Sequence, residues 1–309
     1  MKVVIVGGVA GGASCAARLR RLDEKAEILM VERGPYVSYA NCGLPYHISG
    51  VIPQESSLLV ANEQLFRVMH HIDARTNCEA ISISPKDKTV DLRNGKTGEV
   101  TTESYDKLVL SPGAPSFRPP LPGIDLPGIF HVRTVPDVRT IREWIAGGTG
   151  FLAGMFRYSG IQYVKPTTRA VVVGGGFIGL ETAENLIHLG FEVTLIQKQP
   201  QLLGPLDPEV ARLVEEHVKR HGVRMALDDK VVGIEGLDGG AIEVRTSSGK
   251  CYPADIVILA IGVRPDTKLA EMAGVEVGER GGIRVDEQMR TSDPHIFAVG
   301  DAVEVKDTV

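Results

Sequence analysis

The sequence predicts an α/β protein, because one order of elements occurs in it twice: a buried strand, a glycine-rich turn, a helix and a second strand. The first copy runs from Lys2 to Glu32 and the second from Arg169 to Lys198. Both opening strands are β-branched runs without alternation, as is typical of parallel strands buried on both faces. A chain of 309 residues is long enough for two domains. We therefore expect two Rossmann-like, three-layer dinucleotide-binding domains, the second inserted in the first.

Composition and charge exclude several classes of partner. The formal net charge of −5 and the pI of 5.9 argue against binding to nucleic acid or to an anionic membrane. No apolar run reaches the roughly 18 residues of a membrane span. The apolar N-terminal run is interrupted by glycines and preceded by one Lys, so it does not predict a signal peptide. We expect a cytoplasmic protein with small-molecule partners, whose cysteines are reduced thiols: Cys15, Cys42, Cys78 and Cys251.

The first glycine turn follows a strand over Lys2–Val6 and precedes a helix expected from about Ala13 to Leu22. A second strand, Glu27–Val31, ends at Glu32. A tight turn, a helix N-terminus for a pyrophosphate and an acid for a ribose are the parts of a dinucleotide site. The middle glycine of G-x-G-x-x-G is replaced by Val9, so we expect the backbone there to approach a phosphate differently.

The segment between the two copies contains a predicted helix, short strands and a linker. We expect the helix over about Ser57–His70 and a buried strand over Asp106–Ser111. Pro119–Gly128 is rich in Pro and Gly, which indicates a linker between domains. The predicted first domain is 1–118 with 253–309, and the predicted second domain is 119–252.

The second glycine turn keeps all three glycines of the motif, Gly174, Gly176 and Gly179. Strands over Ala170–Val173 and Glu192–Ile196 and a helix over Leu180–Leu189 complete the unit, which makes it strong evidence for a dinucleotide site. Gln197 and Lys198 stand where an acid is usual. Gln can bind a ribose hydroxyl and Lys a 2′-phosphate, so the choice between NADH and NADPH stays open.

The remaining elements complete the predicted domains. We expect a helix from Asp207, as N-cap, to Gly222, a β-meander over 231–244, and strands over Asp255–Ala260 and Ile296–Val299. The pairs His70-His71 and His217/His221 lack a third ligand nearby, so we predict solvated surfaces and no metal site.

A lone cysteine lies in the stretch Ser38–Tyr46. Cys42 has no partner cysteine two to five residues away and is a candidate nucleophile. If a helix starts at Gly43, its N-terminus favours the thiolate of Cys42. The alternative is that Cys42 is a small buried hydrophobe. Two nucleotide units and one cysteine between them suggest two cofactors on two domains, with a thiol near the place where they meet.

These motifs in this order resemble the FAD-dependent pyridine nucleotide–disulfide oxidoreductases over nearly the whole chain. The motifs are Val9–Gly12, the Cys42 stretch, Gly174–Glu181 and Gly300-Asp301. The chain is most similar to the single-cysteine branch, the coenzyme A–disulfide, persulfide and polysulfide reductases. It lacks the paired cysteines of dithiol reductases, and it has Val9-Ala10 where oxidases and peroxidases of the family usually carry a His.

The resemblance implies roles for particular residues. For FAD on the first domain it implies Gly7, Val9, Gly11, Gly12, Glu32, Arg33, Asn41, Ala80, Gly113, Gly300 and Asp301. For NAD(P)H on the second domain it implies Gly174, Gly176, Phe177, Ile178, Gly179, Glu181, Gln197, Lys198 and Gly262, with Phe177 over the flavin until nicotinamide displaces it. For coenzyme A as substrate moiety it implies Ser14, Arg18, Arg21, Ser38 and Asn41.

The arginines of the first helix allow two interpretations. Arg18 and Arg21 are three residues apart and therefore neighbours on the helix, and two guanidinium groups suit a nucleotide phosphate. Alternatively, Arg18, Arg20 and Arg21 form a basic helix end that is favourable to the helix dipole.

The resemblance implies an NAD(P)H-dependent flavoprotein reductase in which Cys42 attacks a small disulfide, persulfide or polysulfide. The alternatives are an NADH oxidase or peroxidase with a sulfenic acid on Cys42, or an inactive nucleotide-binding fragment. Full-length members are homodimers with a C-terminal dimerisation domain, which we expect this chain, ending at Val309, to lack. The link over 147–166 is longer than usual and is expected to be a lid or an insertion; it carries Phe151, Phe156, Tyr158 and Tyr163.

Overall fold

The computed structural model describes residues 1–147, 168–237 and 240–305, and these form two compact units. The first unit contains Met1–Ala40, Leu59–Pro115 and the chain from Val263 onward. The second contains Asn41–Leu58 and Ser116–Gly262, so the Cys42 stretch divides between the units after Ala40. The predicted insertion over 147–166, with its four aromatic residues, lies outside the described residues after Gly147.

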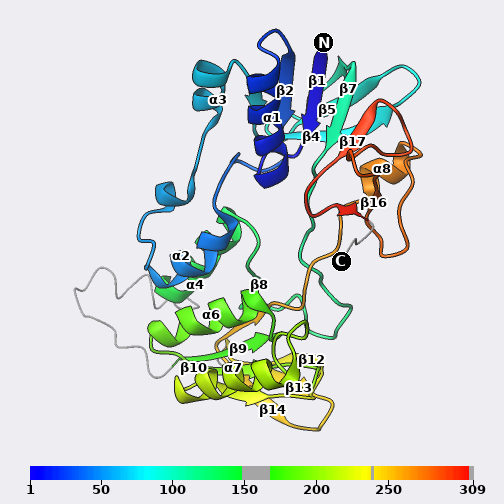
Figure 1. Cartoon of the computed structure of the whole chain (residues 1–309). Coiled ribbons are helices and arrows are strands. Elements are labelled where there is room, and N and C mark those ends of the chain that lie inside the picture. The colour runs from blue at the N-terminus through cyan, green and yellow to red at the C-terminus, as the bar shows by residue number, and fades with distance from the viewer. Residues whose placement is uncertain (148–167, 238–239, 306–309) are drawn as a thin grey trace, which may run out of the picture. The chain divides into compact units, whose positions relative to one another are not determined.

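A five-stranded sheet forms the centre of the first unit (Figure 1), in the order β17-β7-β1-β2-β3, with all neighbours parallel. The strands are β1 Lys2–Val6, β2 Glu27–Val31, β3 Asp73–Arg75, β7 Lys107–Leu110 and β17 Ile296–Ala298. Because successive side chains alternate between faces, Val4 and Val6 enter one buried cluster and Val3 and Ile5 another. The prediction of strands buried on both faces is confirmed.

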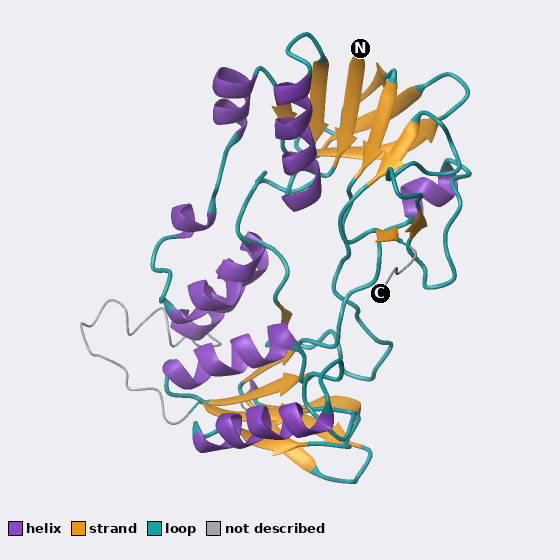
Figure 2. Ribbon diagram, in the orientation of Figure 1, coloured by secondary structure: helices purple, strands orange, loops and turns teal. Residues whose placement is uncertain are grey.

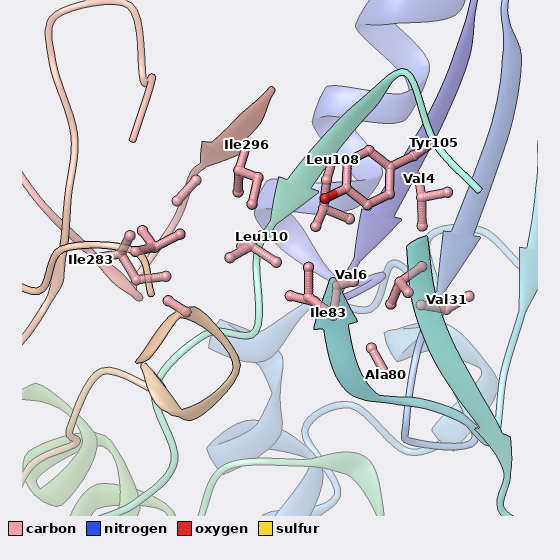
Figure 3. Packing of buried hydrophobic residues seen from close by; sticks show 14 of the residues in the cluster. Val4, Val6, Val31, Ala80, Ile83, Tyr105, Leu108, Leu110, Ile283 and Ile296 are labelled. Carbon is pink, nitrogen blue, oxygen red and sulfur yellow. The ribbon is translucent and has the colours of Figure 1, made fainter. Parts of the chain in front are cut away.

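Two different layers cover this sheet. Helices α1 (Ala10–Leu22) and α3 (Glu63–His70) pack on one face through Ala13, Ala16 and Phe66; Figure 2 shows α1 running alongside the sheet. An antiparallel meander packs on the other face, with Ile83 beside Val6 (Figure 3). Its strands are β4 Cys78–Ser84, β5 Thr89–Asn94 and β6 Val100–Ser104. The first unit is therefore a three-layer domain, as predicted.

The second unit repeats this plan with the parallel order β11-β10-β9-β15-β8. Its strands are β8 Ile129–His131, β9 Arg169–Val173, β10 Glu192–Ile196, β11 Arg224–Ala226 and β15 Ile256–Leu259. The meander β12 (Val231–Gly236), β13 (Ile242–Thr246) and β14 (Cys251–Ala254) packs on one face of the sheet. The helices of its described residues are α2 Leu44–Ser49, α4 Val135–Gly147, α6 Phe177–His188 and α7 Pro208–Arg220.

Short elements complete the described chain. The first unit adds α8 (Lys268–Met272), β16 (Ile283–Arg284) and β18 (Val303–Glu304). The second unit adds two 3₁₀ turns, η1 (Asn41–Gly43) and η2 (Glu55–Leu58).

Several helix boundaries differ from those that the sequence predicts. Both α1 and α6 begin three residues early, because their first turns start inside the glycine turns. The helix expected over Ser57–His70 is interrupted, because the N–H groups of Val60 and Ala61 donate to the carbonyl of Ser38. Asn62 then caps α3 by accepting from the N–H of Leu65 at 2.8 Å. Asp207 is the N-cap of α7, but its side chain makes no capping bond.

The proline-rich stretch over 119–128 packs on the second unit. The N–H of Ile234 on β12 donates to the carbonyl of Pro122 at 2.9 Å. A Cβ on Gly123, which has a φ of +78°, would lie 1.8 Å from the carbonyl oxygen of Ile234. The stretch is thus fixed along β12 by backbone contacts.

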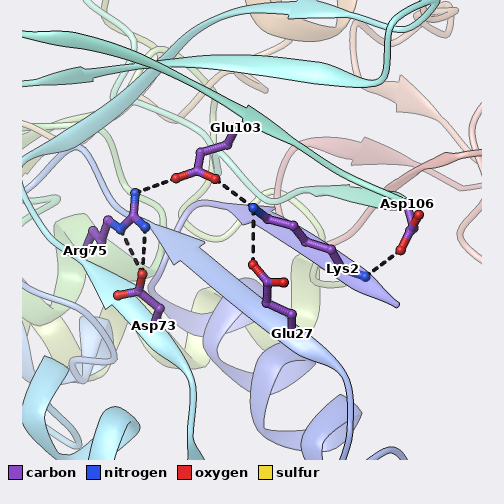
Figure 4. Close-up of polar contacts among 6 residues, drawn as sticks. All are labelled: Lys2, Glu27, Asp73, Arg75, Glu103 and Asp106. Atoms are coloured by element: carbon purple, nitrogen blue, oxygen red, sulfur yellow. Dashed lines mark hydrogen bonds and ion pairs between the residues drawn. The ribbon is translucent and has the colours of Figure 1, made fainter.

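A charged network ties the strand ends of the first unit together (Figure 4). Lys2 Nζ lies 2.7 Å from Glu103 and 3.2 Å from Glu27. Glu103 also pairs with Arg75 at 2.9 Å, and Arg75 pairs with Asp73 at 2.7 Å. The hydrogen bond from Lys2 is the main cause that lowers the pKa of Glu103, and Arg75 lowers it further against the effect of burial.

Within the described ranges, no helix combines the length and the apolar character needed to span a membrane.

Candidate nucleotide and thiol sites

The first glycine turn leaves no room for side chains at two positions. Gly7 has a φ of +99°, and a Cβ on it would lie 1.9 Å from the carbonyl oxygen of Ser111. A Cβ on Gly12 would lie 1.8 Å from the carbonyl oxygen of Gly7. Both positions therefore require glycine for the close packing of strand, turn and helix.

Val9, which replaces the middle glycine of the motif, is the N-cap of α1, and no side chain caps this helix. The amides of the first helical turn have no partner within the helix and are available to an anion. Gly11 serves packing: a Cβ there would lie 2.6 Å from Ser111 Oγ and 3.5 Å from Gly300 Cα. The turn thus brings together three of the predicted positions, Gly7, Gly11 and Gly300.

Glu32 follows β2 and braces the turn. Its Oε2 accepts from the N–H of Gly8 at 2.8 Å, and its Oε1 accepts from the N–H of Gly34 at 2.8 Å. Gly8 was not among the predicted residues, although its place between Gly7 and Val9 could have indicated it. The predicted Arg33 pairs with Asp266 at 2.9 Å; Asp266 was also missed.

The other residues predicted for the first site lie in different surroundings. The side chain of Ala80 is 7% exposed and belongs to the core between the meander and the sheet. Gly113 has a φ of +73°, and its carbonyl accepts from the N–H of Asp266 at 2.9 Å. Gly300 has a φ of +81°, and Asp301 beside it is exposed.

The Cys42 stretch exposes the cysteine and buries its neighbours. Cys42 lies in η1, and Gly43 is the N-cap of α2, as the expected helix start requires. Leu44 and Pro45 are buried, whereas Cys42 is exposed. The interpretation of Cys42 as a buried hydrophobe is therefore wrong.

The other three cysteines lie in surroundings that disfavour a thiolate. All four cysteines lie in the described part of the chain and are free. Burial raises the pKa of the Cys15 and Cys78 thiols. At the exposed Cys251, desolvation by the surrounding protein and, after it, the hydrogen bond with Glu243 raise the pKa of the thiol. Because the thiolate is the nucleophile, these shifts disfavour the three other cysteines.

Helix α2 is anchored to two helices of the second unit. Ser49 Oγ donates to Asn185 Oδ1 of α6 at 2.5 Å, and Asn185 Nδ2 donates to the carbonyl of Glu181 at 2.7 Å. Arg142 of α4 donates to the carbonyl of His47 at 2.6 Å. His47 is buried, and its Nδ1 donates to the carbonyl of Ile52 at 2.7 Å. These contacts fix the element that follows Cys42.

Two glutamates of α6 act electrostatically on Tyr46 of α2. Partial burial raises the pKa of Tyr46, and the charges of Glu184, Glu181 and the Cys42 thiolate raise it further. Burial, then the charge of Glu184, raises the pKa of Glu181. Tyr46 is therefore a neutral phenol at neutral pH. Sequence reasoning did not identify Tyr46, Arg142 or Asn185.

The second glycine turn has the geometry of the first. Gly174 has a φ of +110°, and a Cβ on it would lie 2.2 Å from the carbonyl oxygen of Ala260. A Cβ on Gly179 would lie 2.0 Å from the carbonyl oxygen of Gly174. Gly176, the N-cap of α6, has open space around the position of a Cβ. This space is compatible with a ligand at the helix N-terminus.

The residues predicted to flank the second site are mostly accessible. Phe177 is 65% exposed and Ile178 is 37% exposed, at the start of α6. Gly262 has a φ of +103° and open space around it. Gln197 is buried, and Lys198 beside it is exposed.

The coenzyme A candidates of α1 lie on one exposed helix face. Ser14, Arg18 and Arg21 are exposed and occupy positions four and then three residues apart. Arg20 points elsewhere: its guanidinium donates to five backbone carbonyls, those of Asp23, Glu24, Ala26, His70 and His71. The basic-end interpretation therefore describes Arg20, whereas Arg18 and Arg21 pair with no described residue.

The remaining two candidates belong to different units. Ser38 of the first unit has a φ of +46°, and its N–H donates to the carbonyl of Gly8 at 2.9 Å. Asn41 of the second unit opens η1, next to Cys42.

The comparisons with known proteins agree with this arrangement. A curated NADH oxidase of Methanocaldococcus jannaschii is 34% identical over 100% of this chain and 64% of its own length. A coenzyme A disulfide reductase of Staphylococcus haemolyticus is 32% identical over 98% of this chain and 63% of its own length. The crystal structure of reduced Bacillus anthracis CoADR-RHD matches with a TM-score of 0.89 and 46% identity, over 99% of this chain and 52% of that one.

The present chain thus spans slightly less than two thirds of the curated relatives. The family model for pyridine nucleotide-disulphide oxidoreductases matches residues 1–309, that is, the whole sequence. Together with the two glycine turns and the exposed cysteine, this match shows that the chain belongs to the pyridine nucleotide-disulphide oxidoreductase family.

Proposed function

We propose that this chain is the nucleotide-binding part of a flavoprotein reductase, which uses NAD(P)H to reduce a low-molecular-weight disulfide or persulfide through Cys42. The preferred substrate class is coenzyme A disulfide or coenzyme A persulfide. One observation carries the proposal: Cys42 is exposed at the start of α2, while the residues that follow it are buried and anchored.

The first unit fits FAD. The first turn of α1 carries no capping side chain, which leaves its amides for a pyrophosphate, and Glu32 lies where a ribose is bound in this fold. Arg33, Gly113 and Asp301 remain predicted contacts. When bound, FAD supplies the two-electron chemistry that connects a hydride donor with a disulfide.

The second unit fits NAD(P)H. Helix α6 also lacks a side-chain cap, and the space around Gly176 is open. Phe177 is exposed at the start of this helix, as a residue that yields to a nicotinamide ring must be. Glu181, Gln197 and Lys198 are the side chains proposed to complete this site.

The exposed face of α1 fits coenzyme A. Arg18 and Arg21 carry guanidinium groups that pair with no described residue, and Ser14 lies one turn away from Arg18. Two such groups suit the phosphates of a nucleotide thiol. Ser38 and Asn41 are proposed to contact the same substrate.

The proposed reaction begins at Cys42 Sγ. The thiolate attacks one sulfur of a disulfide R–S–S–R, the S–S bond breaks, and R–S⁻ leaves as Cys42–S–S–R forms. Two electrons, ultimately from NAD(P)H, and one proton then return the Cys42 thiolate and release R–SH. With a persulfide R–S–SH, attack on the outer sulfur gives R–S⁻ and a Cys42 persulfide, and its reduction releases sulfide.

An anaerobic titration of the purified chain tests the proposal. We expect flavin absorption that bleaches with NAD(P)H, and coenzyme A release from its disulfide that Cys42→Ser abolishes. Cys251→Ser is the matched control, because Cys251 is also exposed. Full disulfide and persulfide turnover by Cys42→Ser would end the proposal.

The relative named NADH oxidase supports a second candidate function. An exposed Cys42 thiolate could be oxidised by peroxide to a sulfenic acid and then reduced. Oxygen or peroxide consumption much faster than disulfide reduction would favour this function.

We propose that the full-length protein is a homodimer. We also propose a reducing, cytoplasmic location, because free cysteines persist there. Sedimentation of the full-length protein tests the first proposal.

A further inference from the structure

The residue that follows β10, Gln197, makes the same contact with its glycine turn as Glu32 after β2, but it carries no charge. Gln197 is 9% exposed, and its Oε1 accepts from the N–H of Gly175 at 3.4 Å. Glu32 braces the first turn in the same way, through the N–H of Gly8 at 2.8 Å. A neutral amide therefore replaces a carboxylate while the brace on the glycine turn is kept.

The carboxamide of Gln197 also forms hydrogen bonds with other residues of the protein. Its Nε2 donates to Gln199 Oε1 at 3.2 Å and to the carbonyl of Gln201 at 3.4 Å. In this fold, the side chain at this position faces the 2′ position of the adenosine ribose. A carboxylate there accepts ribose hydroxyls and repels a 2′-phosphate, whereas Gln197 adds no negative charge.

The next residue adds positive charge. Lys198 is exposed and forms no ion pair with any described residue. Of the acids that follow β11, Asp229 is buried and accepts hydrogen bonds from Ser247 and Ser248, while Asp228 is exposed. The N–H of Asp228 donates to the carbonyl of Gln199 at 2.9 Å, which fixes the backbone of this exposed acid to the residue that follows Lys198.

We propose that the second nucleotide site prefers a dinucleotide that carries a 2′-phosphate, NADPH, over NADH. Lys198 supplies the cation that pairs with the phosphate, and Gln197 admits the phosphate because it is neutral. This inference rests on the proposed function of the second unit as a nicotinamide dinucleotide site.

Calorimetry on the whole chain at low ionic strength tests the inference with two probes, 2′,5′-ADP and 5′-AMP. We expect 2′,5′-ADP to bind at least about tenfold more tightly, the size of one charged hydrogen bond. Lys198→Gln should weaken 2′,5′-ADP about tenfold and leave 5′-AMP unchanged. Lys219→Gln, the same charge change at an exposed position of α7, is the matched control and should change neither probe.

Gln197→Glu should reverse the preference between the two probes. Should this buried substitution lower the yield of folded protein, the exposed Lys198→Gln decides the test. Equal affinities in the wild type, or a 2′,5′-ADP affinity that Lys198→Gln leaves unchanged, would overturn the inference. The probes contain neither nicotinamide nor sulfur, so their binding is read independently of flavin, Cys42 and turnover. Cys42-dependent turnover with NADH preferred would refute the specificity alone, and a phosphate preference without turnover would refute the proposed function alone.

Discussion

The two glycine turns are built alike, although one keeps the full motif and the other has Val9 in its middle. In both turns, the first glycine has a strongly positive φ, and the last glycine packs against the carbonyl oxygen of the first. A Cβ would approach that oxygen to 1.8 Å at Gly12 and to 2.0 Å at Gly179. The middle position is less constrained, because Gly176 has open space around it. The outer glycines are therefore required by the fold, whereas the packing of the fold does not require glycine at the middle position.

The strands before the turns are also fixed alike. The N–H of Lys2 donates to Asp106 at 2.6 Å, and the N–H of Arg169 donates to Asp255 at 2.8 Å. Each aspartate precedes the neighbouring parallel strand, β7 or β15. A hydrogen bond from the first strand's backbone to an aspartate side chain thus fixes the strand register at the start of both sheets.

The helices after the turns differ in what covers them. Counted from the last glycine, Arg18 on α1 and Asn185 on α6 occupy the same position, six residues on. Arg18 is exposed, whereas Asn185 is buried and holds Ser49 of α2. The position is therefore open to solvent on α1, whereas its counterpart on α6 holds the helix that follows Cys42.

Substitution of the last glycine should have the strongest effect in both units. We expect Gly12→Ala and Gly179→Ala each to lower the free energy of unfolding by about 3 kcal/mol, because the methyl group overlaps a backbone oxygen. Gly176→Ala is the control and should cost less than about 1 kcal/mol. Urea denaturation measures all three. Equal costs at Gly12 and Gly176 would contradict the contact with Gly7.

The equivalent helix positions should respond differently. Asn185→Ala should cost about 2 kcal/mol, because it removes a buried amide that accepts from Ser49 and donates to the carbonyl of Glu181. Arg18→Ala should change stability by less than about 0.5 kcal/mol, since Arg18 is exposed. A double-mutant cycle with Ser49→Ala isolates the pair. Additive costs would show that Ser49 and Asn185 are not coupled.

The charged network of the first unit should make its stability depend on pH. Glu103→Gln should cost about 1 kcal/mol at neutral pH, because it removes a carboxylate that pairs with both Lys2 and Arg75. The pKa of Glu103 is lowered in the folded state, chiefly by the hydrogen bond from Lys2. Its contribution to stability is therefore complete above the unfolded pKa of about 4.3, and is lost as the pH falls through the folded pKa.

Denaturation curves at several pH values measure this effect. The difference between wild type and Glu103→Gln should shrink as the pH falls below about 4. Glu99→Gln, at an exposed position, is the matched control. A difference that stays constant with pH would mean that the carboxylate contributes nothing.

The smallest effect is expected at Tyr105, in the core of the first unit (Figure 3). Its hydroxyl is buried and has no hydrogen-bond partner among the described residues. Burial raises the pKa of Tyr105 to about 12, with a further contribution from Asp293. Tyr105→Phe should therefore leave stability unchanged or raise it by less than about 1 kcal/mol. A clear loss of stability would indicate a bound water as partner.

The sequence predicted the parallel strands well, because β-branched runs and glycine turns are local signals. The bounds of β1, β2 and β10 are those expected. The starts of α1 and α6 were missed because Val9 and Gly176 are not capping residues that a sequence can reveal. A helix whose first turn has no side-chain cap carries no such signal.

The anchoring of α2 could not be predicted, because it depends on contacts between distant residues. Ser49 meets Asn185 from 136 positions away, and Arg142 meets His47 from 95 positions away. Sequence reasoning identified Cys42 through its neighbours, yet it left open whether the thiol was buried. Only the packing of Leu44 and Pro45 decides this.

The five hydrogen bonds of Arg20 mean that one residue of α1 holds the helix in place, while other residues form its exposed face. Arg20 ties the end of α1 to the end of α3 through the backbone carbonyls of His70 and His71, which remain when the side chains of these two residues are substituted. The fold therefore does not depend on the side chains of Ser14, Arg18 and Arg21. A library randomised at these three positions, with Arg20 held constant, should consist largely of folded proteins that differ in the chemistry of the exposed α1 face.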